Sequence, residues 1–150
     1  MKFLSIIYGI VVYIRNRLYD CKILKEKVLE DTEIICVGNI VVGGAGKTPA
    51  VQYYANKYIL EGKKVGILSR GYKGKRDKNP FLVRDYDKIH CTPIESGDEA
   101  YFHALNLNIP VVVSKDRYKG AKLLKEKFDV KVIIMDDGFQ HRKLKKTENV

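Results

Sequence analysis

The sequence predicts an α/β fold in which helices flank a mostly parallel sheet. Three observations support this prediction. From residue 33 onward, short runs rich in β-branched residues alternate with segments of helical pattern, as in parallel sheets with helical crossovers. A glycine-rich turn that ends in Gly46, Lys47 and Thr48 joins the first of these runs to the first helical segment. A later apolar run, residues 132–135, ends directly in Asp136 and Asp137.

The first 30 residues predict a hydrophobic and basic helix that anchors the chain at a membrane surface. Residues 3–14 form an apolar stretch of 12 residues. As a helix this stretch covers about 18 Å, which is short of a hydrocarbon core of about 30 Å. The stretch is bordered by cations that suit anionic headgroups: Lys2, Arg15, Arg17, Lys22, Lys25 and Lys27. A signal peptide and a buried core helix remain as alternatives.

The alternation of β-branched runs and helical patterns also predicts the strands and helices of the rest of the chain. We expect strands at residues 34–37, 64–68, 81–84, 111–113 and 132–135, and helices at residues 47–60, 98–107 and 117–127. Pro49 is acceptable in the first turn of a helix. Ser96 followed by Glu99 predicts a capping box at the start of the second helix. The chain stops shortly after a strand and a turn, so we expect it to be truncated.

The glycine-rich turn has the composition of a phosphate-binding loop. Its glycines let backbone N–H groups surround phosphate oxygens, and the following helix N-terminus adds partial positive charge. Lys47 is expected to reach the β- and γ-phosphates of ATP, and the Thr48 hydroxyl to bind Mg²⁺. The expected nucleotide-binding residues are Gly43, Gly44, Ala45, Gly46, Lys47 and Thr48. Val41 replaces the first glycine of the strict pattern, and a chance glycine-rich turn is the alternative.

The two aspartates after the last apolar run predict a second half of the same site. In a phosphate-loop fold the carboxyl ends of the strands face the nucleotide, and a carboxylate there can hold Mg²⁺ directly or through water. We therefore expect Asp136 to be a metal ligand. Asp137 and His141 enrich the polar cluster. A plain strand-ending turn is the alternative reading of Asp-Asp-Gly.

Three further segments are expected to emerge near this edge. Arg70, Gly71 and Tyr72 follow the second strand and could hold an acceptor phosphate, or could form a solvated basic loop. Asp98 opens a helix, where an acid is favourable with the helix dipole, and could also accept the proton of an attacking hydroxyl. Arg117 could line the same cleft or merely begin its helix.

Taken together, these motifs resemble the tetraacyldisaccharide 4'-kinase family. The resemblance covers essentially the whole chain, and Asp136-Asp137-Gly138-Phe139-Gln140-His141 is its most specific part. It implies transfer of the ATP γ-phosphoryl group to the 4'-hydroxyl of an acylated disaccharide 1-phosphate in lipid A biosynthesis. It also implies a peripheral position at the cytoplasmic face of the bacterial inner membrane.

The resemblance assigns roles residue by residue. Lys47 and Thr48 match the phosphate-loop lysine and the Mg²⁺ ligand, Asp98 matches the proposed base, and Asp136 matches the acid that binds the metal. Asp137 and His141 match other polar residues of the catalytic cluster. Residues 31–150 would then be the nucleotide-binding kinase domain, and family members continue into a second lobe. Ala100 stands where many of them have proline.

Net charge indicates the kind of binding partner, and cysteine usage indicates the cellular compartment. The 28 lysines and arginines exceed the 18 acids, and the net charge of +10 favours a polyanionic partner. No motif of a nucleic-acid reader accompanies this charge, so we expect none. Cys21, Cys36 and Cys91 lack metal-binding spacing and fit a reducing compartment.

Two other functions remain open. A membrane-positioning ATPase of the ParA/MinD type shares the Gly-Gly-x-Gly-Lys-Thr loop, but such proteins carry a lysine where this chain has Val42. A catalytically inactive fragment that binds nucleotide or anionic lipid is the second alternative. Nucleotide binding without phosphoryl transfer would favour it.

Overall fold

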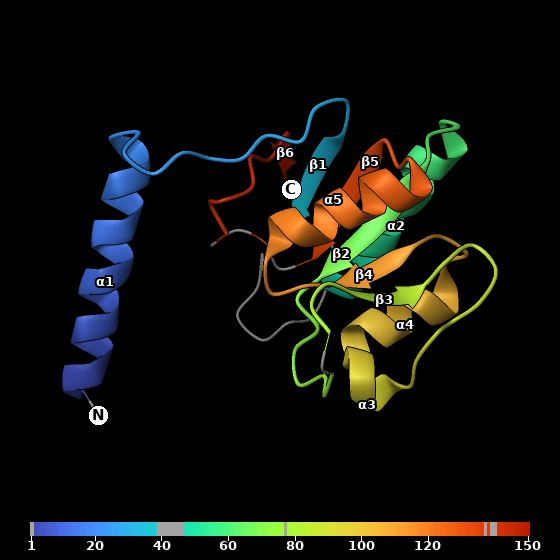
Figure 1. Cartoon of the computed structure of the whole chain (residues 1–150), viewed down its shortest axis with the longest axis horizontal. Helices are drawn as coiled ribbons and strands as arrows, with labels where there is room; N and C mark the ends of the chain where they lie inside the picture. Colours follow the sequence, from blue (N-terminus) through green and yellow to red (C-terminus); the bar gives the residue numbers. More distant parts are fainter. Residues whose placement is uncertain (1, 39–46, 77, 137, 139–140) are drawn as a thin grey trace.

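The protein folds around a mostly parallel sheet, as the sequence predicts. The structure is a computed structural model and describes residues 2–38, 47–76, 78–136, 138 and 141–150. These residues form a six-stranded sheet of order β3-β4-β2-β5-β1-β6 (Figure 1). The strands are β1 (Glu33–Val37), β2 (Val65–Ser69), β3 (Phe81–Arg84), β4 (Val111–Val113), β5 (Val132–Asp136) and β6 (Glu148–Asn149). Only β3 runs antiparallel to its neighbour within this sheet.

Helices connect and cover the strands. They are α1 (Lys2–Asp20), α2 (Lys47–Leu60), α3 (Pro93–Ser96), α4 (Asp98–Asn106) and α5 (Arg117–Phe128). The five predicted strands and the three predicted helices after residue 33 are all present, with each boundary within one residue of its expected position. The short elements α3 and β6 were not expected from the sequence.

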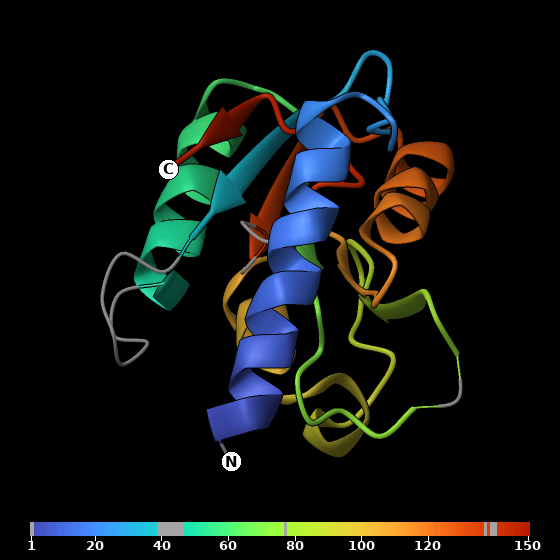
Figure 2. The same cartoon turned by 90° about the vertical axis from the view of Figure 1, so that its left-hand side faces the viewer.

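The sheet has a hydrophobic core on each face. Ile35 and Ile134 point to one side, where Val51 of α2 and Ala104 of α4 pack against them. Successive strand residues point the opposite way, so Cys36 and Met135 join Leu124 of α5 in the second cluster. Figure 2 shows the sheet between α2 and α5. Cys36 is completely buried, as expected for a small core residue.

The strand register brings the carboxyl ends of the parallel strands to one edge. Val37, the last residue of β1, pairs with Asp136, the last residue of β5. On the other side of β5, Ser69 ends β2 beside Val113, and the Ser114 N–H donates to the Ser69 carbonyl oxygen at 3.0 Å. The segments that carry the predicted site residues therefore leave the sheet together.

Helix α1 lies beside the rest of the protein instead of inside it. In Figure 1 it stands apart and is joined to β1 by residues 21–32. Its apolar side chains are exposed: Ile6 is 59% exposed, Val11 58% and Ile14 52%. The alternative of a buried core helix is therefore wrong. None of the helices in the described part of the chain is long and apolar enough to cross a membrane.

The capping box predicted at Ser96 and Glu99 is also wrong. Helix α4 begins after Gly97, with no side-chain cap. The capping box occurs four residues earlier, where the Thr92 N–H donates to Glu95 Oε2 at 2.7 Å and starts α3. Pro93 at the first position of α3 favours this choice, because proline needs no hydrogen-bond partner there.

Candidate active site

The predicted nucleotide-binding end of the site lies between β1 and α2. Gly43, Gly44, Ala45 and Gly46 lie outside the described residues. Lys47 and Thr48 form the first turn of α2, where both are half-buried, and Pro49 follows them as expected. Strand β1 precedes helix α2, which is the order that phosphate binding requires.

Asp136 lies deep in the structure at the end of β5. It is 2% exposed, and its Oδ2 lies 3.4 Å from Nε2 of His103 in α4. Its Oδ1 is buried and has no hydrogen-bond partner in the part of the chain that the structure describes. A buried carboxylate oxygen requires a donor or a cation, so this atom fits the predicted contact with Mg²⁺ or its water shell.

The described residues do not by themselves complete a metal site. No group of three or more His, Cys, Asp or Glu side chains among them could hold a metal ion. Asp137, the second predicted acid, lies outside the described residues. Its predicted catalytic role stays a prediction, as do the metal contacts of Thr48 and Asp136.

Arg117 fastens the N-terminus of α5 to the end of β5. Its guanidinium donates to the Asp136 carbonyl oxygen at 3.0 Å and to the Ser114 carbonyl oxygen at 3.5 Å, and the residue is 2% exposed. Its backbone N–H donates to His141 Nε2 at 3.2 Å. The structure thus gives Arg117 a role in holding the site together. Its predicted contact with the acceptor remains untested.

His141 is held as a neutral imidazole. Burial lowers the pKa of His141, and the charges of Arg117 and Lys146 lower it further, to about 4. Because Nε2 accepts the Arg117 N–H, the ring proton resides on Nδ1 near neutral pH. In this state His141 serves as a hydrogen-bond acceptor that fixes the chain after Asp136.

Asp116 links the start of α5 to the segment after His141 through an ion pair. Its carboxylate caps α5 by accepting from the N–H groups of Tyr118 and Lys119, at 3.1 and 3.3 Å. It also accepts from Lys143 Nζ at 2.7 Å. Burial raises the pKa of Asp116, but Lys143 and the backbone N–H groups outweigh burial and hold it below its usual value.

The loop after β2 packs directly against the start of α4. Gly97 has a φ of 86°, and a Cβ there would lie 2.4 Å from the Tyr72 carbonyl oxygen. Arg76 fixes this loop, because its guanidinium donates to the carbonyl oxygens of Gly71 and Arg70 at 3.0 and 2.9 Å. Asp98 follows Gly97 and is exposed. The structure therefore brings the predicted base beside the predicted acceptor loop.

Within this loop, the three predicted substrate-binding residues differ in accessibility. Arg70 and Tyr72 are exposed, whereas Gly71 is buried with a φ of 69°. A side chain at Gly71 would collide with the Arg76 guanidinium at 2.6 Å. Gly71 thus allows Arg76 to pack, while Arg70 and Tyr72 are available for contact with a ligand.

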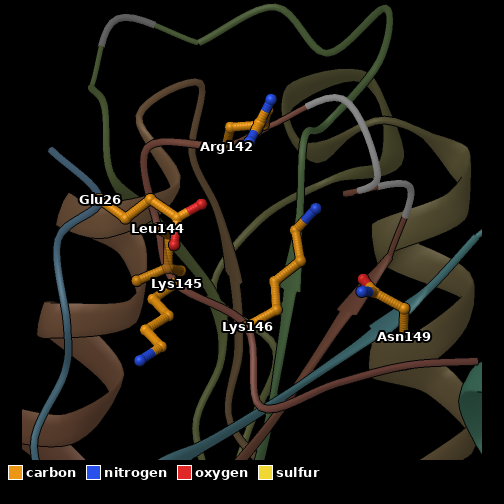
Figure 3. Close-up of a pocket in the computed structure, with 6 residues that line it drawn as sticks. All are labelled: Glu26, Arg142, Leu144, Lys145, Lys146 and Asn149. Carbon is orange, nitrogen blue, oxygen red and sulfur yellow. The ribbon is translucent and has the colours of Figure 1, made fainter. Parts of the chain in front are cut away.

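A basic pocket adjoins the segment that follows His141. Its volume is about 370 Å³, and it is lined by Glu26, Arg142, Leu144, Lys145, Lys146 and Asn149 (Figure 3). In Figure 3 the Lys146 side chain extends toward the side on which Arg142 lies, whereas Lys145 points away. Burial lowers the pKa of Lys146. The surplus of cations over the single carboxylate favours an anionic group here.

Sequence reasoning missed two residues of this region, His103 and Arg142. His103 carried a usable signal, because Ala100, His103, Ala104 and Leu107 have the spacing of a buried helix face. No local pattern distinguished Arg142 from the other cations of a basic chain.

Comparison with known proteins gives a consistent result. A family model described as tetraacyldisaccharide-1-P 4'-kinase matches residues 1–150. The tetraacyldisaccharide 4'-kinase of Aquifex aeolicus is 46% identical over 147 residues, which are 97% of this chain and 45% of the relative. That of Halothermothrix orenii is 38% identical over 152 residues, covering 100% of this chain and 39% of the relative.

A solved structure is also similar over the same region. A crystal structure of LpxK from Aquifex aeolicus in complex with ATP matches with a TM-score of 0.85 and 46% identity. The match covers 97% of this chain and 45% of that one. The chain thus spans less than half the length of these relatives.

Proposed function

The chain belongs to the tetraacyldisaccharide 4'-kinase family, and from this premise we propose that the protein transfers the γ-phosphoryl group of ATP to the 4'-hydroxyl of a tetraacyldisaccharide 1-phosphate. The observation that carries the proposal is the register of Val37 with Asp136. This register sets the predicted metal acid beside the strand that leads into the phosphate loop. The family match also favours this reaction over a membrane-positioning ATPase.

Each part of the site has a distinct task in the proposed reaction. Lys47 would bind the β- and γ-phosphates, while Thr48 and Asp136 would hold Mg²⁺. The metal, when bound, neutralises charge on the phosphates and on the leaving group. Asp98 accepts the proton of the 4'-hydroxyl as its oxygen bonds to the γ-phosphorus, and the bond from that phosphorus to the β–γ bridging oxygen breaks to release ADP.

Asp98 must be placed to receive the proton of the acceptor hydroxyl. Phosphoryl transfer proceeds through a loose transition state, so this proton leaves late and the carboxylate must be aligned with the hydroxyl as the new bond forms. The exposed carboxylate of Asp98 directly follows Gly97, which packs against the Tyr72 carbonyl oxygen, and it is accessible to a bulky acceptor. Arg117 and His141 support the reaction indirectly, because they hold the chain on either side of Asp137.

We further propose that α1 lies in the cytoplasmic interface of the bacterial inner membrane. Its exposed Ile6, Val11 and Ile14 would enter the acyl region, and Arg15 and Arg17 would meet anionic headgroups. The pocket with Arg142 and Lys146 adjoins the end of this helix and would favour the phosphate of an acylated disaccharide. An acceptor held in the membrane could then reach the site without leaving the lipid phase.

The decisive test is transfer of labelled γ-phosphate from MgATP to tetraacyldisaccharide 1-phosphate in detergent. The assay compares the 150-residue chain, the Aquifex aeolicus relative, and a chimera in which residues 1–150 replace the matching part of that relative. Lys47→Ala in the chimera is the negative control. We expect transfer by the relative and the chimera, and none with Lys47→Ala. A folded chimera that binds ATP without transferring phosphate would contradict the proposal and favour an inactive nucleotide-binding chain.

A further inference from the structure

Two buried side chains meet at the end of β5, and each leaves one polar atom without a partner. His103 is fully buried, and its Nε2 lies 3.4 Å from Oδ2 of Asp136. His103 Nδ1 and Asp136 Oδ1 are both buried without a hydrogen bond among the described residues. The pair links α4 to β5 across 33 positions of the sequence.

Packing alone does not explain an imidazole at this position. Ala100 and Ala104 flank His103 on the buried face of α4 and belong to the apolar cluster beneath it. An aliphatic side chain would fill such a space without burying a nitrogen that lacks a partner, which costs stability. Among the described residues, Asp136 is the one polar group in hydrogen-bond contact with the ring. We therefore attribute the presence of a histidine at position 103 to its contact with the Asp136 carboxylate.

We propose that His103 is a positioning residue for the metal-binding carboxylate. A carboxylate accepts hydrogen bonds, so the ring proton lies on Nε2 and is donated to Oδ2. This contact holds the carboxylate in one orientation and directs Oδ1 to Mg²⁺ or to a water in its shell. Outer-sphere partners of this kind orient metal ligands and commonly affect metal affinity. The inference rests on the proposed binding of MgATP.

The main chain and the side chain of Asp136 are then fixed by different residues. Arg117 donates to the Asp136 carbonyl oxygen at 3.0 Å and holds the backbone. His103 acts on the carboxylate. Because Asp98 begins the helix that contains His103, α4 also sets the distance between the proposed base and the metal acid. His103 lies five residues after Asp98, which is about 7.5 Å along the axis of α4.

The test compares His103→Leu, which removes the donor, with His103→Gln, whose side-chain amide can still donate. Mn²⁺ replaces Mg²⁺, and its binding to the full chain with a non-hydrolysable ATP analogue is measured by electron paramagnetic resonance. We expect His103→Leu to weaken Mn²⁺ binding by roughly tenfold or more, and His103→Gln to stay within about threefold of the unchanged chain. Affinity for the analogue without metal should change little in either variant.

Leu107→Ala is the matched control, because it removes packing from the same helix without affecting a donor to Asp136. Its thermal stability should fall while Mn²⁺ affinity is retained. Equal Mn²⁺ affinity in His103→Leu and the unchanged chain would overturn the inference, as would an equal loss of affinity in Leu107→Ala. If the unchanged chimera, like the unchanged chain, bound no Mn²⁺ with nucleotide, the proposed function would fail together with the inference. If it bound Mn²⁺ and His103→Leu did not change that binding, the inference alone would fail.

Discussion

Arg142 Nη2 donates to Asp20 Oδ1 at 2.8 Å and thereby joins the end of α1 to the residue after His141. The same guanidinium donates to the Asn16 carbonyl oxygen at 3.1 Å and lies 5.3 Å from the ring centre of Tyr19. A cation at the last turn of a helix also interacts favourably with the helix dipole. The apolar helix is thus tied directly to the chain segment that holds Arg117 and Asp136.

Arg142→Ala should loosen this link. The partly exposed ion pair contributes at most about 1 kcal/mol, a factor of about five in the opening equilibrium. The hydrogen bond to Asn16 and the contact with Tyr19 are lost with it, so opening should increase by about fivefold or more. Trypsin should then cut faster after Lys22, Lys25 and Lys27 in the segment between α1 and β1. Lys145→Ala is the control, because it removes an exposed cation of the same loop whose side chain points away from the side on which Arg142 lies. Equal cleavage rates in both variants would show that Arg142 does not hold α1.

His141 predicts a loss of stability as the pH falls. Its folded pKa is about 4 and its ordinary pKa is 6.5. Between these values the unfolded chain binds a proton that the folded chain does not, so the free energy of unfolding decreases from about pH 6.5 down to about pH 4. Below pH 4 both states are protonated and this contribution becomes constant. Burial, Arg117, Lys146 and Arg15 oppose the imidazolium, whereas Asp116 favours it.

The comparison that isolates this effect is urea unfolding at pH 7 and pH 5 for the unchanged chain and for His141→Gln. Carboxylates contribute equally to the pH dependence of the unchanged chain and of the variant. The difference between the two pH dependences therefore measures the contribution of His141. We expect the unchanged chain to lose more stability than the variant. The opposite order would mean that the folded state accepts the proton readily, in conflict with the hydrogen bond from Arg117.

Much of the fold could be predicted from sequence because all its elements except α3 and β6 have clear local borders. Strands such as 111–113 are short β-branched runs that follow Pro110, and helices such as α5 begin at a recognisable cap. The shared edge also follows from the pattern, since parallel strands joined by helical crossovers end on the same side. The candidate acids Asp98 and Asp136 were therefore identified without coordinates.

Other parts of the site depend on contacts between distant segments. The Ser/Thr-x-x-Glu pattern occurs at both Thr92 and Ser96, and local sequence did not decide which one caps a helix. His103 could be placed on a buried helix face, but its partner Asp136 follows from the strand order, in which β5 inserts between β1 and β2. Arg142 reads as one cation among 28 until α1 is seen beside it.

Gly97→Ala should disturb both stability and the position of Asp98. The φ of 86° disfavours any side chain, and the added Cβ would meet the Tyr72 carbonyl oxygen at 2.4 Å. We expect a loss of about 2–4 kcal/mol in the free energy of unfolding, combining backbone strain with the clash. Phosphoryl transfer by the chimera should fall further than stability alone explains, because the helix that carries Asp98 must shift.

Gly62→Ala provides the matched control. Gly62 has a similar φ of 76°, but its Cβ would meet nothing within 4 Å. The free energy of unfolding of Gly62→Ala should therefore fall by about 1 kcal/mol from backbone strain alone, and phosphoryl transfer should be unchanged. Chemical denaturation of both variants measures the difference. Equal losses would indicate that the loop of Tyr72 moves away from Gly97 without cost, and the close packing would then have no energetic role.

Asp98→Asn tests the proposed base directly. The substitution keeps the size of the side chain and removes its ability to accept a proton, so transfer by the chimera should fall by roughly 10²–10⁴-fold. ATP affinity should change little, because the expected phosphate ligands are Lys47 and the loop before it. Glu99→Gln is the control: it removes the neighbouring exposed acid from the same first helical turn and therefore has the same effect on the helix dipole. Loss of transfer in Asp98→Asn but not in Glu99→Gln would assign the proton to Asp98, whereas equal activities in the two variants would remove Asp98 from the mechanism.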